Sequence, residues 1–231
     1  MPHEDTLARK EKMKKISILV AITHTGEVVA GLESKLSKWI YESPHKAELH
    51  FSQINPTYSN RNTVVKYFLE KTAHTHLLFI DSDTVPFDNP LPMAELGLDI
   101  VGGVYPSWRI DHYEWLAMLR QPDGHYKMLP SDQRKGVIEC DGIGAGCMMI
   151  EREVLKALDD PFADKIRPDG RREVGHDYYF CERSKALGYK VWADWDVLCD
   201  HVKQVPLISV VQALKKSFDE GMRQGIDKTK G

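Results

Sequence analysis

Two aspartates separated by one residue, Asp81 and Asp83, directly follow the apolar run at 77–80. Such a run favours a central strand that is covered on both faces, and ligands of open α/β sheets bind just beyond the carboxyl ends of such strands. Carboxylate oxygens are the ligands that Mg²⁺ and Mn²⁺ prefer. The pair therefore predicts a positive partner, either a divalent cation suited to holding a diphosphate or a basic side chain. A lone D-x-D is also typical of a solvated turn or a helix cap.

The elements that must position this pair alternate between strand and helix. Apolar patterns predict strands at 16–22, 47–54 and 76–80, with one helix at 27–41 and another that starts near Ser59. Consecutive strands that are joined by helices lie parallel through right-handed crossovers. The first 83 residues therefore predict a parallel, doubly wound sheet.

The second half of the chain has a more mixed pattern. Its predicted elements are strands at 99–105, 113–119, 124–129, 144–150, 189–193 and 197–199, and helices at 151–158 and 176–187. The strands between 113 and 129 have the pattern of a hairpin, which predicts a small mixed β region in addition to the main sheet.

The bulk composition favours one α/β domain. At 231 residues the chain can bury a substantial core, and its net charge of −3 excludes a globally basic nucleic-acid binder. The four cysteines lie far apart without a C-x-x-C pair, which indicates neither a zinc cluster nor a disulfide framework. We therefore expect a protein of a reducing compartment, the cytoplasm.

The two ends differ from the single domain predicted at 16–205. Residues 1–15 are polar and rich in lysine and arginine, without the apolar stretch of a secretory signal, and predict a flexible arm. Residues 206–231 predict an amphipathic helix and a tail, and we expect the apolar stripe of this helix to pack on the core rather than on a membrane. No apolar run approaches the roughly 18 residues of a membrane-spanning helix.

Three further motifs follow the aspartate pair. The glycine-rich segment 141–146 precedes an apolar strand, where glycine suits either the close approach of a ligand or a tight turn. Asp177 opens a predicted helix, where an acid serves either chemistry or the unpaired N–H groups of the first turn. His201 ends a short strand as either a metal ligand or an ordinary surface or core histidine. Each motif alone leaves both interpretations open.

In this order, after a βαβαβ unit, the motifs resemble those of the GT-A glycosyltransferases, in particular the family 2-like enzymes with a D-x-D motif. The resemblance extends over most of residues 16–202. It implies a GT-A type, Rossmann-like sandwich with a central, mostly parallel sheet and a small mixed β region. It also implies a hexosyltransferase that moves a sugar from a nucleotide-diphosphate donor, with a UDP-sugar favoured, to a hydroxyl acceptor.

The resemblance also implies roles for single residues. Asp81, Asp83 and His201 would hold Mn²⁺ or Mg²⁺. Asp177 would be the catalytic carboxylate, which either deprotonates the acceptor hydroxyl or shields the cationic sugar. His176 departs from the family pattern, because it stands where the first acid is usual. The expected contacts with the donor nucleotide and its sugar are Thr23, Arg61, Asn62, Asp81, Ser82, Gly144, Ala145 and Gly146.

Two other functions compete with this interpretation. Segment 81–85 also fits the D-x-D-x-T/V motif of haloacid dehalogenase-like phosphohydrolases, with Asp81 as the nucleophile, although that motif normally lies on the first strand. The other alternative is a non-catalytic module that binds a nucleotide sugar, and the missing acid at His176 favours it. The sequence leaves open the donor base, the sugar, the stereochemical outcome, the oligomeric state and the acceptor, including a modified nucleobase.

Overall fold

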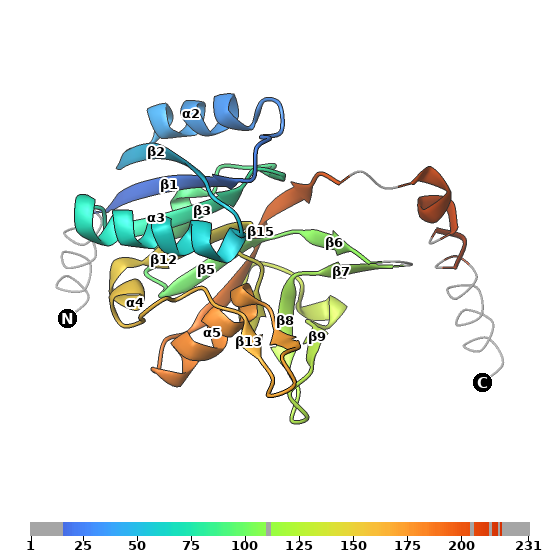
Figure 1. Ribbon diagram of the computed structural model, residues 1–231. Coiled ribbons are helices and arrows are strands. Elements are labelled where there is room, and N and C mark those ends of the chain that lie inside the picture. Colours follow the sequence, from blue (N-terminus) through green and yellow to red (C-terminus); the bar gives the residue numbers. More distant parts are fainter. Residues whose placement is uncertain (1–15, 110–111, 204–205, 213, 217, 219–231) are drawn as a thin grey trace, which may run out of the picture.

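A computed structural model describes residues 16–109, 112–203, 206–212, 214–216 and 218. The described chain forms one central sheet with helices on both of its faces, and short β ribbons formed by the second half of the sequence (Figure 1).

The central sheet is a mostly parallel one. Its strands lie in the order β2 (Lys46–Gln53), β1 (Ser17–His24), β3 (His76–Asp81), β12 (Cys147–Glu151), β5 (Ile100–Val104), β15 (Val191–His201) and β10 (Val137–Cys140). Only β12 and β10 run antiparallel to their neighbours, so the other five strands point the same way. The predicted Rossmann-like sandwich with a central, mostly parallel sheet is confirmed.

Helices cover both faces of this sheet. They are α2 (Leu32–Glu42), α3 (Thr57–Lys71), α4 (Arg152–Lys156) and α5 (His176–Ala186), with short 3-10 turns η1 (Leu91–Leu96) and η2 (Ser131–Gln133). Buried residues of α3, α4 and α5 pack on one face, and those of α2 and η1 on the other. Successive residues of β1, such as Leu19 and Val20, belong to opposite core layers. This two-sided burial explains the continuous apolar sequence of the central strands.

The small mixed β region is present as predicted. It consists of β8 (Ala117–Arg120) between β9 (Tyr126–Met128) and β11 (Gly142–Ile143), and of the pairs β6 (Pro106–Trp108) with β7 (Tyr113–Trp115) and β13 (Lys165–Ile166) with β14 (Arg172–Val174). The ribbon of β6 and β7 extends away from the central sheet (Figure 1).

The helix predicted at 27–41 begins later, at Leu32. Gly31 precedes it with a φ angle of 84°, a left-handed conformation that glycine adopts without strain. The residues before it form a loop that returns to the turn containing Asp81 and Asp83, which we call the acidic turn. There the amide of Val29 donates a 2.8 Å hydrogen bond to the carbonyl oxygen of Ser82. The predicted helix began too early because apolar residues of this loop happen to continue the helical spacing of α2.

The two short strands predicted at 189–193 and 197–199 form one strand, β15. Its register on β5 shifts between Asp194 and Leu198, which marks a bulge. Beyond the bulge, β15 pairs antiparallel with β4 (Thr84–Pro86), the short strand that follows the aspartate pair. The bulge thus allows one strand to pair with two partners and to carry its last residues to the acidic turn.

The C-terminal segment differs from its prediction. Its described residues between 207 and 218 are helical, but Leu207 is 76% exposed and Phe218 is 67% exposed. The apolar stripe therefore does not pack on the core as expected. Across the described part of the chain, no helix is long and apolar enough to cross a bilayer. The arm predicted at 1–15 and the tail beyond 218 lie outside the described residues.

Gly103 of β5 makes room for the bulge of β15. A Cβ at Gly103 would lie 2.8 Å from the carbonyl oxygen of Val197 and 3.0 Å from Cys147 Sγ. We expect Gly103→Ala to lower the free energy of unfolding by about 1–3 kcal/mol, because the bulge must move. Urea denaturation measures this loss. Gly175→Ala is the matched control, since a Cβ there meets nothing within 4 Å. Equal losses in both variants would contradict close packing as the cause.

Candidate functional site

A polar cavity of about 210 Å³ lies at the carboxyl ends of β1 and β3. The end of β1, the start of α3, the acidic turn and the end of β15 contribute to it. It is lined by Thr23, His24, Thr25, Thr57, Asn60, Asp81, Ser82, Asp83, His201 and Lys203. The predicted metal ligands Asp81, Asp83 and His201 therefore share one cavity. Its position at the carboxyl ends of parallel strands is where open α/β sheets bind ligands.

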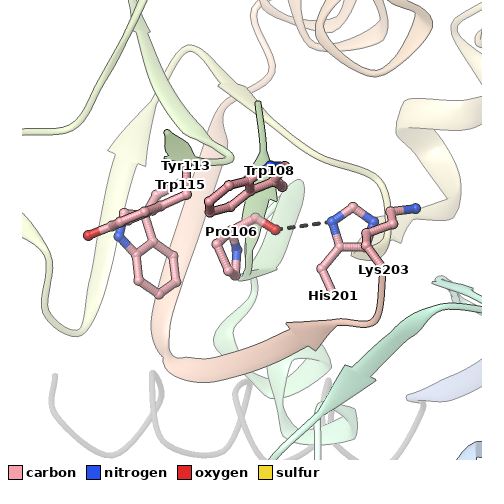
Figure 2. Close-up of a pocket in the computed structure, with 6 residues that line it drawn as sticks. All are labelled: Pro106, Trp108, Tyr113, Trp115, His201 and Lys203. Carbon is pink, nitrogen blue, oxygen red and sulfur yellow. Dashed lines mark hydrogen bonds between the residues drawn. The ribbon is translucent and has the colours of Figure 1, made fainter. Parts of the chain in front are cut away.

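The pairing of β15 with β4 brings His201 beside Asp83. His201 lies opposite Thr84, and the amide of Val202 donates a 2.8 Å hydrogen bond to the carbonyl oxygen of Asp83. His201 Nδ1 lies 3.0 Å from the carbonyl oxygen of Pro106, which can only accept (Figure 2). Nδ1 therefore carries the proton. The other ring nitrogen, Nε2, lies 3.6 Å from Asp83 Oδ2.

Asp83 is ionised at neutral pH. Burial acts to raise the pKa of Asp83, but its contacts with His201 and Lys203 outweigh burial and lower the pKa to about 2. Lys203 follows β15 directly and forms an ion pair with Asp83. The acidic turn thus combines one carboxylate, one imidazole and one ammonium group within a single cavity.

The donor set fits a divalent cation that brings some of its own ligands. Among the described residues, no three His, Cys, Asp or Glu side chains are arranged to hold a metal. Asp83 and His201 nevertheless offer one carboxylate oxygen and one imidazole nitrogen on the same side of the cavity. Proteins commonly bind Mg²⁺ through one or two side chains, with substrate phosphates and water completing the coordination. The pair therefore fits an ion that arrives with a diphosphate.

Arg61 is buried between two carboxylates. Its Nη2 donates to both oxygens of Asp81 at 2.8 Å, and its Nη1 donates to Asp177 Oδ1 at 2.5 Å. Its side chain is only 1% exposed. Burial acts to lower the pKa of Arg61, but the charges of Asp177 and Asp81 outweigh burial and raise it. Arg61 is therefore a fixed cation that connects α3 with the end of β3 and the start of α5.

Asp177 is held by the protein on both of its oxygens. Oδ2 accepts a 3.1 Å hydrogen bond from the amide of Ala145, and Oδ1 lies 2.9 Å from His176 Nε2. Burial acts to raise the pKa of Asp177, but Arg61, His176 and the Ala145 amide lower it well below its usual range. Asp177 is therefore ionised but a weak proton acceptor. His176 also donates its backbone N–H to Asp164 Oδ1 at 2.9 Å, so it fixes the helix start.

The structure does not bring Arg61 and Asn62 to the cavity lining. Arg61 is occupied by the two carboxylates. Asn62 Nδ2 donates to the carbonyl oxygen of Phe162 at 2.7 Å, and Asn62 Oδ1 accepts from the Phe162 amide at 2.9 Å. Both side chains thus have partners within the protein, and the nucleotide contacts expected of them stay a prediction. Thr23 does line the cavity, and its hydroxyl donates to Asp81 Oδ1 at 2.8 Å.

The glycine-rich segment 144–146 is buried against Tyr105. A Cβ at Gly144 would overlap the Tyr105 hydroxyl, and one at Gly146 would lie 2.7 Å from it. The amide of Gly146 also donates to this hydroxyl at 2.8 Å. Packing against Tyr105 explains why both positions are glycine. The expected approach of the donor to this segment stays a prediction.

The sequence-based prediction missed half of the cavity lining. The missed residues are His24, Thr25, Thr57, Asn60 and Lys203. Asn60 is the most informative, because its Nδ2 donates to the carbonyl oxygens of Ser52 and His24 at 2.9 Å and 3.4 Å, while its buried Oδ1 has no hydrogen-bond partner. A buried acceptor without a partner calls for a donor, which either water or a ligand in the adjoining cavity can supply. The only signal in the sequence was its place in the first turn of α3, next to Arg61.

Known proteins share the fold of this chain. No protein-family model matches the sequence, and no curated protein has a similar sequence. A197 from STIV is 22% identical, with 82% of this chain and 87% of that chain covered and a TM-score of 0.55. GalNAc-T7, solved with UDP, GalNAc and Mn²⁺, is 11% identical, with 83% and 44% covered and a TM-score of 0.48. At these identities the likeness concerns the fold alone.

The ion pair of Asp177 with Arg61 predicts acid sensitivity. Because the pKa of Asp177 is lower in the folded protein than its unfolded value of 3.8, its stabilising contribution is complete above about pH 4 and is lost as the pH falls toward the folded value. We expect Asp177→Asn to reduce the fall in unfolding free energy between about pH 4 and pH 2, as measured by urea denaturation. Exposed Asp88 supplies the control, Asp88→Asn, which should keep the wild-type slope. An unchanged slope in Asp177→Asn would contradict this assignment.

Proposed function

We propose that this protein is a metal-dependent glycosyltransferase that moves a sugar from a nucleotide-diphosphate donor, UDP-sugar above all, to a hydroxyl acceptor. The observation that carries this proposal is the shared cavity of Asp83, His201 and Lys203 at the carboxyl ends of β1 and β3. A carboxylate and an imidazole suit Mn²⁺ or Mg²⁺, and an ammonium group beside them suits a phosphate oxygen.

Asp83 Oδ2 and His201 Nε2 are the atoms that we assign to the metal. When bound, the cation supplies Lewis-acid stabilisation of the charge that develops on the departing diphosphate. The Pro106 carbonyl supports this role, since a histidine ligand usually donates its other ring N–H to such an acceptor. Lys203 releases Asp83 and turns to the diphosphate in this scheme.

The nucleoside occupies the part of the cavity formed by β1 and α3. Asp81 accepts hydrogen bonds from Arg61 and Thr23 and therefore acts on the ribose or a bound water, not as a direct metal ligand. Asn60 Oδ1 offers an acceptor without a partner, which suits the N3–H group of uracil. Other nucleobases also carry N–H donors, so the preference for a UDP-sugar rests on the resemblance to the GT-A glycosyltransferases.

The transfer exchanges one bond at the anomeric carbon. The bond from that carbon to the diphosphate oxygen breaks, and its electron pair leaves with the diphosphate. The acceptor hydroxyl oxygen forms the new bond to the anomeric carbon, and its proton passes to solvent water. Asp177 is a weak base because of Arg61 and is not among the residues that line the cavity. We therefore assign it no proton transfer, and its negative charge acts on the oxocarbenium-like sugar from outside the cavity lining.

The two alternative functions have less support. A phosphohydrolase would need Asp81 as a free nucleophile, whereas Arg61 contacts both of its oxygens, and β3 is the third strand along the chain rather than the first. A binding module without catalysis predicts nucleotide-sugar binding with no release of UDP. Enzymatic measurement therefore separates it from the transferase.

Binding of UDP with Mn²⁺ tests the cavity directly. At about 100 times its dissociation constant, a ligand of the folded state adds about 2.7 kcal/mol, or roughly 5–10 °C in melting temperature for a chain of this size. Incubation with UDP-glucose, UDP-galactose and UDP-N-acetylglucosamine in Mn²⁺ should release UDP from the preferred donor. We expect Asp83→Ala to reduce the Mn²⁺-dependent release by about 10²-fold or more.

Asp88→Ala is the control for this experiment, because Asp88 is an exposed aspartate close to the same turn. Asp88→Ala should show the wild-type increase in melting temperature with UDP and Mn²⁺, and the wild-type rate of UDP release. If UDP binds but no donor releases UDP, the binding-module function replaces the transferase. Release that is equal with and without Mn²⁺, or equal in Asp83→Ala, would contradict the assigned metal site.

A further inference from the structure

A second cavity, of about 400 Å³, adjoins the first one. It is lined by Pro106, Trp108, Tyr113, Trp115, His201 and Lys203 (Figure 2). Since His201 and Lys203 line both cavities, the two spaces share a wall. The aromatic side chains come from the ribbon of β6 and β7, where Trp108 pairs with Tyr113. This ribbon contributes no residue to the first cavity.

We propose that the second cavity binds the acceptor, and that this acceptor is a saccharide with a pyranose ring stacked on Trp108 and Trp115. The proposal rests on the function proposed for the first cavity, because a shared wall places an acceptor hydroxyl beside the sugar-diphosphate bond. The volume lies within the range of about 300–1,000 Å³ that small-ligand pockets occupy. It suits one or two sugar rings rather than an extended chain.

The chemistry of the lining favours a carbohydrate. One face of a pyranose presents polarised C–H bonds, which the negative face of an indole attracts, while its hydroxyl groups point outward. The lining combines three aromatic rings and a proline with only two strongly polar side chains, His201 and Lys203, and these lie at the wall shared with the donor cavity. A pyranose bound here would contact the aromatic rings with its apolar face. Its reacting hydroxyl group would lie beside the hydrogen-bonding side chains of His201 and Lys203.

The aromatic wall is anchored on one side and open on the other. Trp115 packs against Trp195, with ring centroids 5.5 Å apart, and so fixes the ribbon to the core. Tyr113 is 52% exposed although it is a large aromatic residue. Clustered aromatic side chains that stay open to solvent indicate a binding surface. A rigid platform next to a reacting bond suits an acceptor better than it suits packing alone.

Binding of simple sugars to the full-length protein tests this proposal. The probes are the methyl pyranosides of glucose, galactose, mannose and N-acetylglucosamine, observed by saturation-transfer NMR and titrated by chemical shift. We expect at least one of them to bind, and Trp108→Ala to raise its dissociation constant about tenfold, which corresponds to about 1.4 kcal/mol. Trp108→Phe should restore most of the affinity, because it keeps an aromatic face.

Tyr41→Ala is the matched control, since Tyr41 is an aromatic residue on α2 that is 91% exposed. It should leave the affinity for the sugar unchanged. Uridine, thymidine and 5-hydroxymethylcytidine form the competing panel. Binding of these nucleosides at the ribbon without binding of any pyranoside would overturn the proposal, as would a sugar affinity that Trp108→Ala does not change. If the wild-type protein binds a pyranoside but does not bind UDP in the presence of Mn²⁺, the result counts against the proposed donor site alone.

Discussion

The ion-paired cluster of Arg61 with Asp81 and Asp177 is the interaction on which the site depends. A buried guanidinium without partners would cost several kcal/mol, and two carboxylates beside each other would repel. Each charge is therefore tolerated only because the others are present. Since Arg61 belongs to α3, Asp81 to β3 and Asp177 to α5, this requirement fixes three elements relative to one another. The amide of Ala145 adds the glycine-rich segment to the same cluster.

The second constraint is the length of β15. Its first half completes the central sheet beside β5, and its second half leaves that sheet to pair with β4. Without the bulge between Asp194 and Leu198, His201 would not lie opposite Thr84. Gly103 allows the bulge to approach β5, so a residue in the middle of the core influences the position of a proposed metal ligand.

Much of the fold follows from the sequence, because strands buried on both faces leave an unbroken apolar pattern and the crossover rule then fixes their direction. The placement of Asp81 and Asp83 at the carboxyl end of β3 could be anticipated in the same way, whereas His201 was expected beside them only from the resemblance to the GT-A glycosyltransferases. The contacts of Arg61 with Asp177 and of Asn62 with Phe162 could not be anticipated, because these partners lie about a hundred residues further along the chain. The prediction that the apolar stripe near Leu207 packs on the core was wrong for a related reason. Amphipathicity predicts a helix, but it does not say what covers the apolar face.

Pro106 connects the two cavities in physical terms. Its ring lines the aromatic cavity, while its carbonyl oxygen accepts a hydrogen bond from His201 Nδ1 and thereby sets which nitrogen faces Asp83 (Figure 2). A movement of the ribbon of β6 and β7 would change this hydrogen bond, and with it the orientation of the imidazole. In the proposed enzyme, the acceptor and the metal would therefore act on the same histidine from opposite sides. Occupation of one cavity would then alter the affinity of the other, and the coupling would be equal in both directions.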